Sequence, residues 1–527
     1  MSGLMVLARK HSTLLGFVLL ALMWEMAGQR HWVGDGALPA PSAVLQAWYR
    51  DRADYPAHIW GTLKTALAGF VIGNFCAIGL GVLFAWFRPF ERLMAGVNVT
   101  LFAMPAIALV PILVIALPGD SPRVVLSALS VYYPTMVATV LGLTQVDARL
   151  ADLVRVYGGS SWSVMRWVRL RSSLPTVLAG LRVAAPAAVL GSLLAEFGSG
   201  GSAGLGTYLI GSLGRADPAR LWGIGLAATA ISGLAYALAG LLARRFAGNT
   251  VSASLTPGRQ AGPLAESALY RWVLHAGALA MPFVLWLAVI GLFESLGVSE
   301  IVLRGPQGVY EHVFTSEAAA DNRDSLWLAL GETLPITLLG MFAGLAVALA
   351  FAVATTVWRS LGRTLLPLAL VSQSMPLVAL TPLVVLVFGR GSLSILVVTV
   401  SVTFFPAFVT IAQGLVLVPA SATDLVRVYG ARRWRQLQLV ALPWSLPYLC
   451  AAARLAAPRA FLGVMIAEWL ATGTGIGNLL NVSRGVLDFG MIWSVAVVAI
   501  LIAVALNSLV VVLERYVLQR YAMAPAA

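Results

Sequence analysis

Long stretches of mostly apolar residues recur along the chain, separated by short polar segments. A helix needs about 20 such residues to cross the hydrocarbon of a bilayer, where only helices and closed barrels satisfy their backbone groups. Charged residues make up 11% of this chain, whereas soluble domains carry about 25%. The sequence therefore predicts an all-α integral membrane protein with about 12 transmembrane helices, near residues 12–28, 62–86, 95–117, 123–143, 176–196, 221–243, 272–293, 327–357, 363–388, 392–417, 448–469 and 490–513.

The basic residues predict the orientation of these helices. The net charge is +13, and nearly all basic residues are arginines. Cytoplasmic loops of membrane proteins are enriched in Arg and Lys, which also face anionic lipid. Most of the 35 basic residues fall in loops that share one side when the amino terminus is cytoplasmic. We therefore expect both termini in the cytoplasm and membrane lipids as partners, and we assign the charge to topology, not to nucleic-acid binding. Glu25 interrupts the first apolar segment, which favours a retained helix over a signal peptide.

The two halves of the chain align with each other from about Gly61 and Glu332 onward. Each half is predicted to hold six crossings, and two repeats with an even number of crossings have the same orientation, so a pseudo-two-fold axis runs along the membrane normal. We expect two parallel six-helix repeats, residues 1–247 and 272–527, joined by a cytoplasmic linker at 248–271, with a path between them. Matched pairs include Thr62/Thr333, Met104-Pro105/Met375-Pro376, Pro111/Pro382, Pro134/Pro406, Arg182/Arg454, Pro186/Pro458 and Glu196/Glu468.

One heptapeptide, DLVRVYG, occurs twice, at 152–158 and at 424–430. Each copy lies in a basic loop between the fourth and fifth crossings of its half, at 146–175 and 418–447. The pattern predicts a short helix, a stop at Gly158 or Gly430, a second helix, and a proline that marks the start of the next crossing. A short helix with an apolar face outside the membrane needs a groove on a partner.

These loops resemble the "EAA" loop of bacterial ABC importer permeases, in which E-A-A-x-x-x-G is followed by x-L-P. The variant A-R-x-Y-G-A-S-x-W, typical of permeases for nitrate, sulfonate, taurine and bicarbonate, is similar to Arg427-Val428-Tyr429-Gly430-Ala431 followed by Trp434, with Leu442-Pro443 behind it. Aspartate replaces the glutamate of the family pattern in both copies, Leu-Val replaces the two alanines, and the first copy has Arg171 where the second has Pro443. The resemblance covers nearly all of both halves and implies a type I ABC importer permease with two permease domains fused in one chain.

The resemblance also implies partners and a location. The chain would be a multi-pass protein of the bacterial cytoplasmic (inner) membrane that works with two copies of an ABC ATPase subunit and a periplasmic or lipid-anchored substrate-binding protein. The solute would be a small anion or a sulfonate-like organic compound. The residues implied to dock the ATPase subunits are Asp152, Leu153, Val154, Arg155, Val156, Tyr157 and Gly158 in the first loop, and Asp424, Leu425, Val426, Arg427, Val428, Tyr429 and Gly430 in the second.

The chain itself lacks the motif of an ATP site. A P-loop needs a Gly-Lys-Ser/Thr run, and neither of the two lysines, Lys10 and Lys64, follows a glycine. We therefore expect no cofactor and no catalytic residue in this chain, with ATP–Mg bound by the partner ATPase. The histidines and the two cysteines form no metal-ligand spacing, so we expect no metal site. A secondary active transporter with parallel six-helix repeats is the main alternative, and a membrane-embedded enzyme is the third.

Two helix breakers lie in the third crossing of each half, and broken helices often line substrate sites. A structural kink is the alternative. The halves differ here in polarity, because Ser372, Gln373 and Ser374 align with apolar residues, whereas Tyr132 and Tyr133 align with phenylalanines. Carboxylates at membrane depth are functional by default, although Glu196 and Glu468 could instead cap the glycine-rich segments that follow them. The candidates for the translocation path are Met104, Pro105, Tyr132, Tyr133, Glu196, Ser372, Gln373, Ser374, Met375, Pro376 and Glu468.

Overall fold

The computed structural model describes residues 18–199, 201, 203–215, 217–247, 268–358 and 376–521, and every regular element in these ranges is a helix. The first half contains η1 (Gly34–Gly36), α2 (Pro41–Arg50), α3 (Tyr55–Trp86), α4 (Arg88–Leu93), α5 (Ala95–Ala103), α6 (Ala106–Ala116), α7 (Ser121–Thr144), α8 (Ala148–Val156), α9 (Ser161–Val164), η2 (Met165–Arg169), α10 (Leu170–Ser199), α11 (Leu205–Leu213) and α12 (Pro218–Ala247). The second half contains α13 (Ala268–Ser295), α14 (Pro306–Tyr310), η3 (Glu311–Thr315), α15 (Ala319–Val357), α17 (Leu377–Phe388), α18 (Ser392–Val416), α19 (Ala420–Val428), α20 (Arg433–Gln436), η4 (Leu437–Ala441), α21 (Leu442–Trp444), α22 (Leu446–Ala467), η5 (Glu468–Thr472), α23 (Gly475–Gly485) and α24 (Phe489–Arg520).

Within these ranges, nine helices are long and apolar enough to cross a membrane, and the bent pair α5 and α6 makes a tenth candidate. They correspond to ten of the predicted crossings. The other two fall partly on residues outside the described ranges: of 12–28 the structure describes the short apolar helix Val18–Gln29, and of 363–388 it describes α17. Most of the predicted linker, 248–271, also lies outside the described residues.

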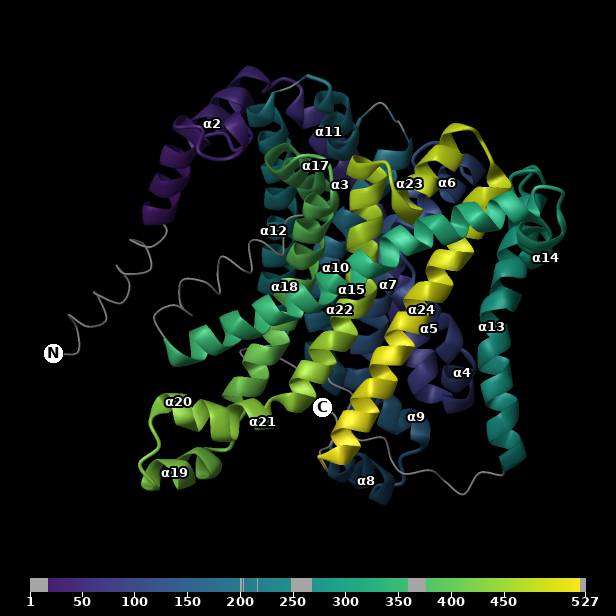
Figure 1. Cartoon of the computed structure of the whole chain (residues 1–527). Helices are drawn as coiled ribbons and strands as arrows, with labels where there is room; N and C mark the ends of the chain where they lie inside the picture. Colours follow the sequence, from purple (N-terminus) through teal and green to yellow (C-terminus); the bar gives the residue numbers. More distant parts are fainter. Residues whose placement is uncertain are drawn as a thin grey trace.

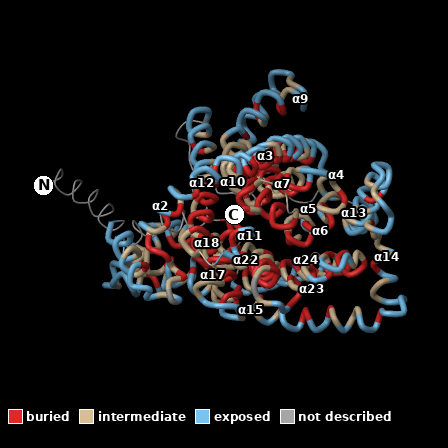
Figure 2. Tube along the Cα trace, turned by 90° about the horizontal axis from the view of Figure 1, so that it is seen from above, coloured by how far each residue is buried: buried red, intermediate tan, exposed pale blue. Residues whose placement is uncertain are grey.

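The two halves use equivalent helices to contact each other. In the first half α6 packs against α24, α22 and α23 of the second half, and α17 of the second half packs against α12, α10 and α11 of the first. Helices α6 and α17 hold equivalent positions in their halves, and each contacts the equivalent set of helices in the other half. A pseudo-two-fold axis requires this reciprocity. One apolar core, which includes Ile107 and Ala108 of α6, Val378 and Leu383 of α17 and Phe461 of α22, spans both halves. Viewed from above, the buried residues concentrate in this central group of helices, while α13 and α15 lie at the outer edge (Figure 2).

In each half a pair of tryptophans joins the first apolar helix, Val18–Gln29 or α13, to the last long helix, α12 or α24. Trp24 packs on Trp222 of α12 with ring centroids 5.9 Å apart, and Trp286 of α13 packs on Trp493 of α24 at 5.7 Å. The Trp222 indole donates a hydrogen bond to the Ala37 carbonyl at 3.0 Å, and the Trp493 indole donates one to a loop carbonyl at 2.8 Å. The duplication is therefore visible in side-chain contacts as well as in the order of helices.

Helix α13 belongs to the second half by sequence but packs along α4 and α5 of the first half. It stands at one edge of the molecule in Figure 1. The boundary between the halves in sequence is therefore not a boundary in space, because the first long helix of the second half crosses over to its neighbour.

The prediction that a proline marks the start of the fifth crossing is wrong in the first half. A continuous helical segment runs from Ser161 to Ser199 through a π-turn at η2, and Pro175 lies inside α10. In the second half the chain does break, at Ser445, between α21 and α22. The second copy has prolines at both 443 and 447, and each removes a backbone donor, whereas the first copy has Arg171 in place of the earlier proline.

Candidate functional site

The two copies of the heptapeptide form matching short helices at one end of the molecule, which we call the loop end. Helices α8 and α19 both lie there, and α11 and α23 lie at the opposite end (Figure 1). Each short helix carries the same internal ion pair, Asp152–Arg155 at 3.0 Å and Asp424–Arg427 at 3.2 Å. The two loops therefore emerge on the same face, as two parallel repeats require.

Both helices end in the turn that the sequence predicts. Gly158 has φ +79° and Gly430 has φ +78°, in the left-handed region that favours glycine. The Gly159 amide donates to the Val154 carbonyl at 2.9 Å, and the Ala431 amide donates to the Val426 carbonyl at 3.1 Å. This closes each helix and sends the chain back toward the bundle.

Several apolar side chains of these helices and of the turns that follow them are exposed. Val156 and Tyr157 are 83% and 84% exposed, and Val428 and Tyr429 are both 85% exposed. No residue of α8 or α19 is buried. Equivalent apolar surfaces of this kind, duplicated on one face, are typical of a binding site for another protein. The docking role of the individual residues stays a prediction.

The third crossing of the first half is broken where the sequence places its first helix breaker. Helices α5 and α6 meet at an angle of 96° around Met104 and Pro105, and Pro105 is buried. Pro111 lies inside α6 without ending it. In the second half α17 begins directly after the buried Pro376, while Met375 lies outside the described residues. Both breaks lie beside helices that join the two halves.

The predicted polar site between the halves is described only in part. Ser372, Gln373 and Ser374 lie outside the described residues. The Tyr132 hydroxyl donates to Asn98 of α5 at 3.0 Å, within its own half. The Tyr133 ring packs on Phe102 at 4.5 Å. The role of these residues in the path stays a prediction.

Glu196 and Glu468 are 0% and 2% exposed and occupy equivalent places. The Gly206 amide donates to Glu196 Oε2 at 2.7 Å, and the Gly477 amide donates to Glu468 Oε2 at 2.9 Å. Each carboxylate therefore binds the first turn of the short helix that follows it, α11 or α23, which is the capping alternative raised by the sequence. A carboxylate at a helix amino terminus is stabilised by the free amides and by the helix dipole.

A threonine from α3 in the first half, and one from α15 in the second, complete this arrangement. The Leu205 amide donates to Thr62 Oγ1 at 2.8 Å, and the Ile476 amide donates to Thr333 Oγ1 at 2.9 Å. Thr333 also donates to Glu468 at 2.8 Å. We call each set, a threonine, a glutamate and the helix start they hold, a Thr–Glu clamp. The two threonines align in the sequence without a predicted role, although a polar residue matched within two apolar segments is a usable signal.

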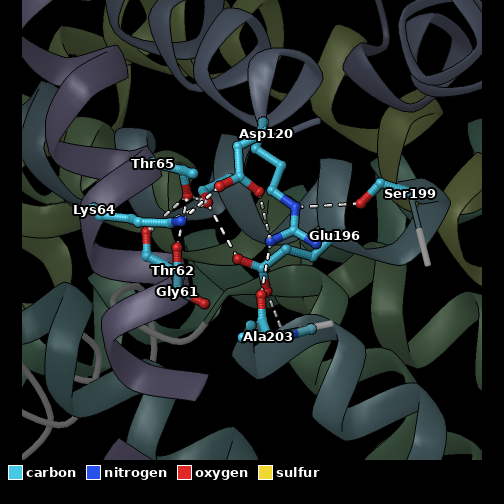
Figure 3. Close-up of polar contacts among 12 residues, drawn as sticks. Gly61, Thr62, Lys64, Thr65, Asp120, Glu196, Ser199 and Ala203 are labelled. Atoms are coloured by element: carbon cyan, nitrogen blue, oxygen red, sulfur yellow. Dashed lines mark hydrogen bonds and ion pairs between the residues drawn. The ribbon is translucent and has the colours of Figure 1, made fainter. Parts of the chain in front are cut away.

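The first half adds an ionic network beside its clamp (Figure 3). The Arg123 guanidinium donates to the Ala203 carbonyl at 2.7 Å and to Ser199 Oγ at 3.2 Å. Asp120 lies 3.4 Å from Arg123 and 2.6 Å from Lys64 Nζ. The partner of the equivalent amide also differs, since the Gly204 amide donates to His58 Nδ1 at 3.1 Å in the first half and the Gly475 amide donates to Glu332 at 2.6 Å in the second. The clamps are equivalent, but their surroundings carry different charges.

The arrangement of helices and loops agrees with comparisons to known proteins. A family model described as "Binding-protein-dependent transport system inner membrane component" matches residues 77–249 and again residues 338–523, which together cover more than half of the chain. The chain belongs to this family. It is an ABC transporter permease, a multi-pass membrane component of binding-protein-dependent import, with two permease domains in one polypeptide.

Several curated permeases are similar to this one. The riboflavin transport system permease protein RibX of Chloroflexus aurantiacus is 32% identical over 30% of the chain, and the match covers 59% of that relative. A probable ABC transporter permease protein of Haemophilus influenzae is 28% identical over 45% of the chain and 92% of its own length. A putative aliphatic sulfonates transport permease protein SsuC of Escherichia coli is 29% identical over 31% of the chain and 64% of its length. No solved structure matches the permease.

Proposed function

We propose that this permease forms the translocation path of an ATP-driven importer in a bacterial inner membrane and couples it to two ATPase subunits, one at each loop. The observation that supports this most is the pair of equivalent helices α8 and α19, which carry unpaired apolar side chains on one face of the molecule. Because the two sites are equivalent, two copies of one ATPase subunit fit them. ATP–Mg is bound by those subunits, and this chain carries no cofactor of its own.

The path lies between the halves, and the loop end faces the cytoplasm together with both termini. A substrate-binding protein then delivers the solute to the opposite end, where α11 and α23 lie. Relatives are named for riboflavin, for a formylaminopyrimidine and for aliphatic sulfonates. Within this range we propose a small anion or a sulfonate-like organic solute, on the resemblance of the loops to those of the nitrate and sulfonate group.

Charge placed on the exposed valines tests the coupling. Val156→Asp and Val428→Asp together introduce a carboxylate into each docking surface, which must be desolvated when the partner binds. The expected result is loss of ATP hydrolysis stimulated by the binding protein, with normal assembly of the permease in the membrane. Val156→Thr and Val428→Thr together are the matched control, because threonine keeps the shape of valine at these exposed positions and adds no charge to either docking surface. Full stimulation in the double variant would refute the docking assignment.

A further inference from the structure

Arg459 is an arginine near the centre of the membrane-spanning helix α22 that the duplication does not explain. It follows Pro458, and the residue after the matching Pro186 in the first half is Ala187. Within the described part of the chain Arg459 forms no ion pair and no hydrogen bond, unlike Arg454, which lies 3.4 Å from Glu514 of α24. A charged side chain at membrane depth is costly unless it is paired, and it usually marks a path for ions or substrates.

Three sides of α22 are occupied by helices of its own half. Gly463 lies against Thr399 of α18, Ala456 and Ala460 pack with Met341 of α15, and α24 covers the side of Arg454. Residues spaced by three or four positions share a helix face, so Leu455, Arg459 and Leu462 form the remaining face. All three of these residues are partly accessible.

That remaining face points toward the contact between the halves. Leu462 packs against the core that contains residues of both α6 and α17, and α22 contacts both of these helices. The Arg459 side chain is half-buried. It lies on the side of α22 that faces α6 and α17, where the two halves meet.

The chemistry of the guanidinium specifies the class of ligand. It is permanently charged, offers five donors in a planar fork, and matches carboxylate, sulfonate and phosphate groups in bidentate geometry. We propose that Arg459 is the anion-binding residue of the translocation path, where it pairs with the oxyanion group of the solute as it passes between the halves. This proposal rests on the proposed function, because it takes the contact between the halves to be the path. Under this proposal the second half of the permease recognises the negative charge of the solute.

A charge-selective labelling experiment tests both the position and the charge. In the full-length permease with Cys76→Ala and Cys450→Ala, a single cysteine is introduced by Leu455→Cys, one helical turn from Arg459. Its rate of reaction is measured in permeabilised membrane vesicles with an anionic reagent, 2-sulfonatoethyl methanethiosulfonate, and with a cationic one, 2-(trimethylammonio)ethyl methanethiosulfonate. Both reagents react in water, so a cysteine that faces lipid stays unlabelled. Leu501→Cys on the exposed side of α24 is the control for that case.

The anionic reagent is expected to react faster than the cationic one at Leu455→Cys. Arg459→Ala is expected to lower the ratio of the two rates by about tenfold or more, because one unit charge a turn away is removed. Arg459→Lys should keep most of the ratio, and Arg459→Ala combined with Ala187→Arg should restore part of it from the other side of the axis. No labelling at Leu455→Cys, or a ratio that Arg459→Ala leaves unchanged, would overturn the proposal.

Thermal stability separates this role from a structural one. Removing an unpaired buried charge relieves its desolvation cost, so Arg459→Ala is expected to melt no lower than the parent protein. A lower melting temperature would mean that Arg459 serves the packing of α22, and would also overturn the proposal. Neither measurement requires ATP hydrolysis or a known solute. A failure of coupling in the valine variants would therefore contradict the proposed function without altering these results.

Discussion

The Thr–Glu clamps predict a local effect that can be measured in each half separately. Thr62→Val and Thr333→Val keep the shape of a fully buried side chain and remove only its hydroxyl. The first variant leaves the Leu205 amide without its acceptor, and the second leaves the Ile476 amide without its acceptor and removes the bond to Glu468. An unsatisfied buried donor costs about 1–3 kcal/mol. Both variants are expected to have an effect of this size, because each threonine also makes a hydrogen bond with the glutamate of its clamp.

Amide hydrogen exchange in detergent-solubilised permease measures this cost where it arises. A local cost of about 1–3 kcal/mol corresponds to roughly 5- to 150-fold faster exchange, since each 1.4 kcal/mol is a factor of about ten. The faster exchange is expected in peptides that contain the start of α11 for Thr62→Val, and the start of α23 for Thr333→Val. Thr139→Val is the control, because Thr139 is equally buried but donates only to the Thr135 carbonyl of its own helix. Exchange in α11 and α23 that matches the control would refute the clamp.

Three further effects follow from single groups. Gly158→Ala or Gly430→Ala should destabilise its loop by roughly 1–2 kcal/mol through the positive φ alone, because no atom lies within 4 Å of the added carbon. Amide exchange of the loop measures this cost. Asparagine adopts a positive φ more readily than alanine, so an equal effect in a Gly→Asn variant would contradict the explanation. Burial lowers the pKa of His312 from its ordinary value of 6.5, so the unfolded chain takes up the proton first and stability should fall as the pH drops below about 6.5. The melting temperature should fall less with decreasing pH in His312→Gln than in the parent protein. The same pH dependence in both proteins would contradict this role of His312. Trp222→Phe and Trp493→Phe each remove one indole hydrogen bond and should each cost about 0.5–1.5 kcal/mol, seen as similar decreases in melting temperature; a large difference between them would contradict the equivalence of the halves.

The sequence predicts the architecture well because apolar segments, helix breakers and the duplication are local or repeated signals. The break at Met104 and Pro105 follows from a proline that cannot donate its amide, and the turn at Gly158 follows from its conformational freedom. Each of these signals is carried by a few adjacent residues. The structure agrees with these predictions because none of them depends on a contact between residues far apart in the sequence.

The sequence does not predict which side chains meet across the fold. The contact of Thr62 with the Leu205 amide joins positions 143 residues apart, and no local pattern records it. Arg459 was missed for another reason. Arg459 lies in the fifth crossing and has an alanine as its counterpart, whereas the differences in polarity between the halves were compared only in the third and fourth crossings. A residue that breaks the duplication at membrane depth was the signal to look for.

Cross-linking from the two loops tests the central claim most directly. In a permease that otherwise lacks cysteines, Tyr157→Cys and Tyr429→Cys are coupled to a bifunctional reagent in the presence of the ATPase subunit, and the mass of the product is determined. We expect one permease chain joined to two ATPase subunits when both cysteines are present, and to one subunit when either is present alone. Products that never exceed one ATPase subunit, or that form through only one of the two loops, would contradict the account.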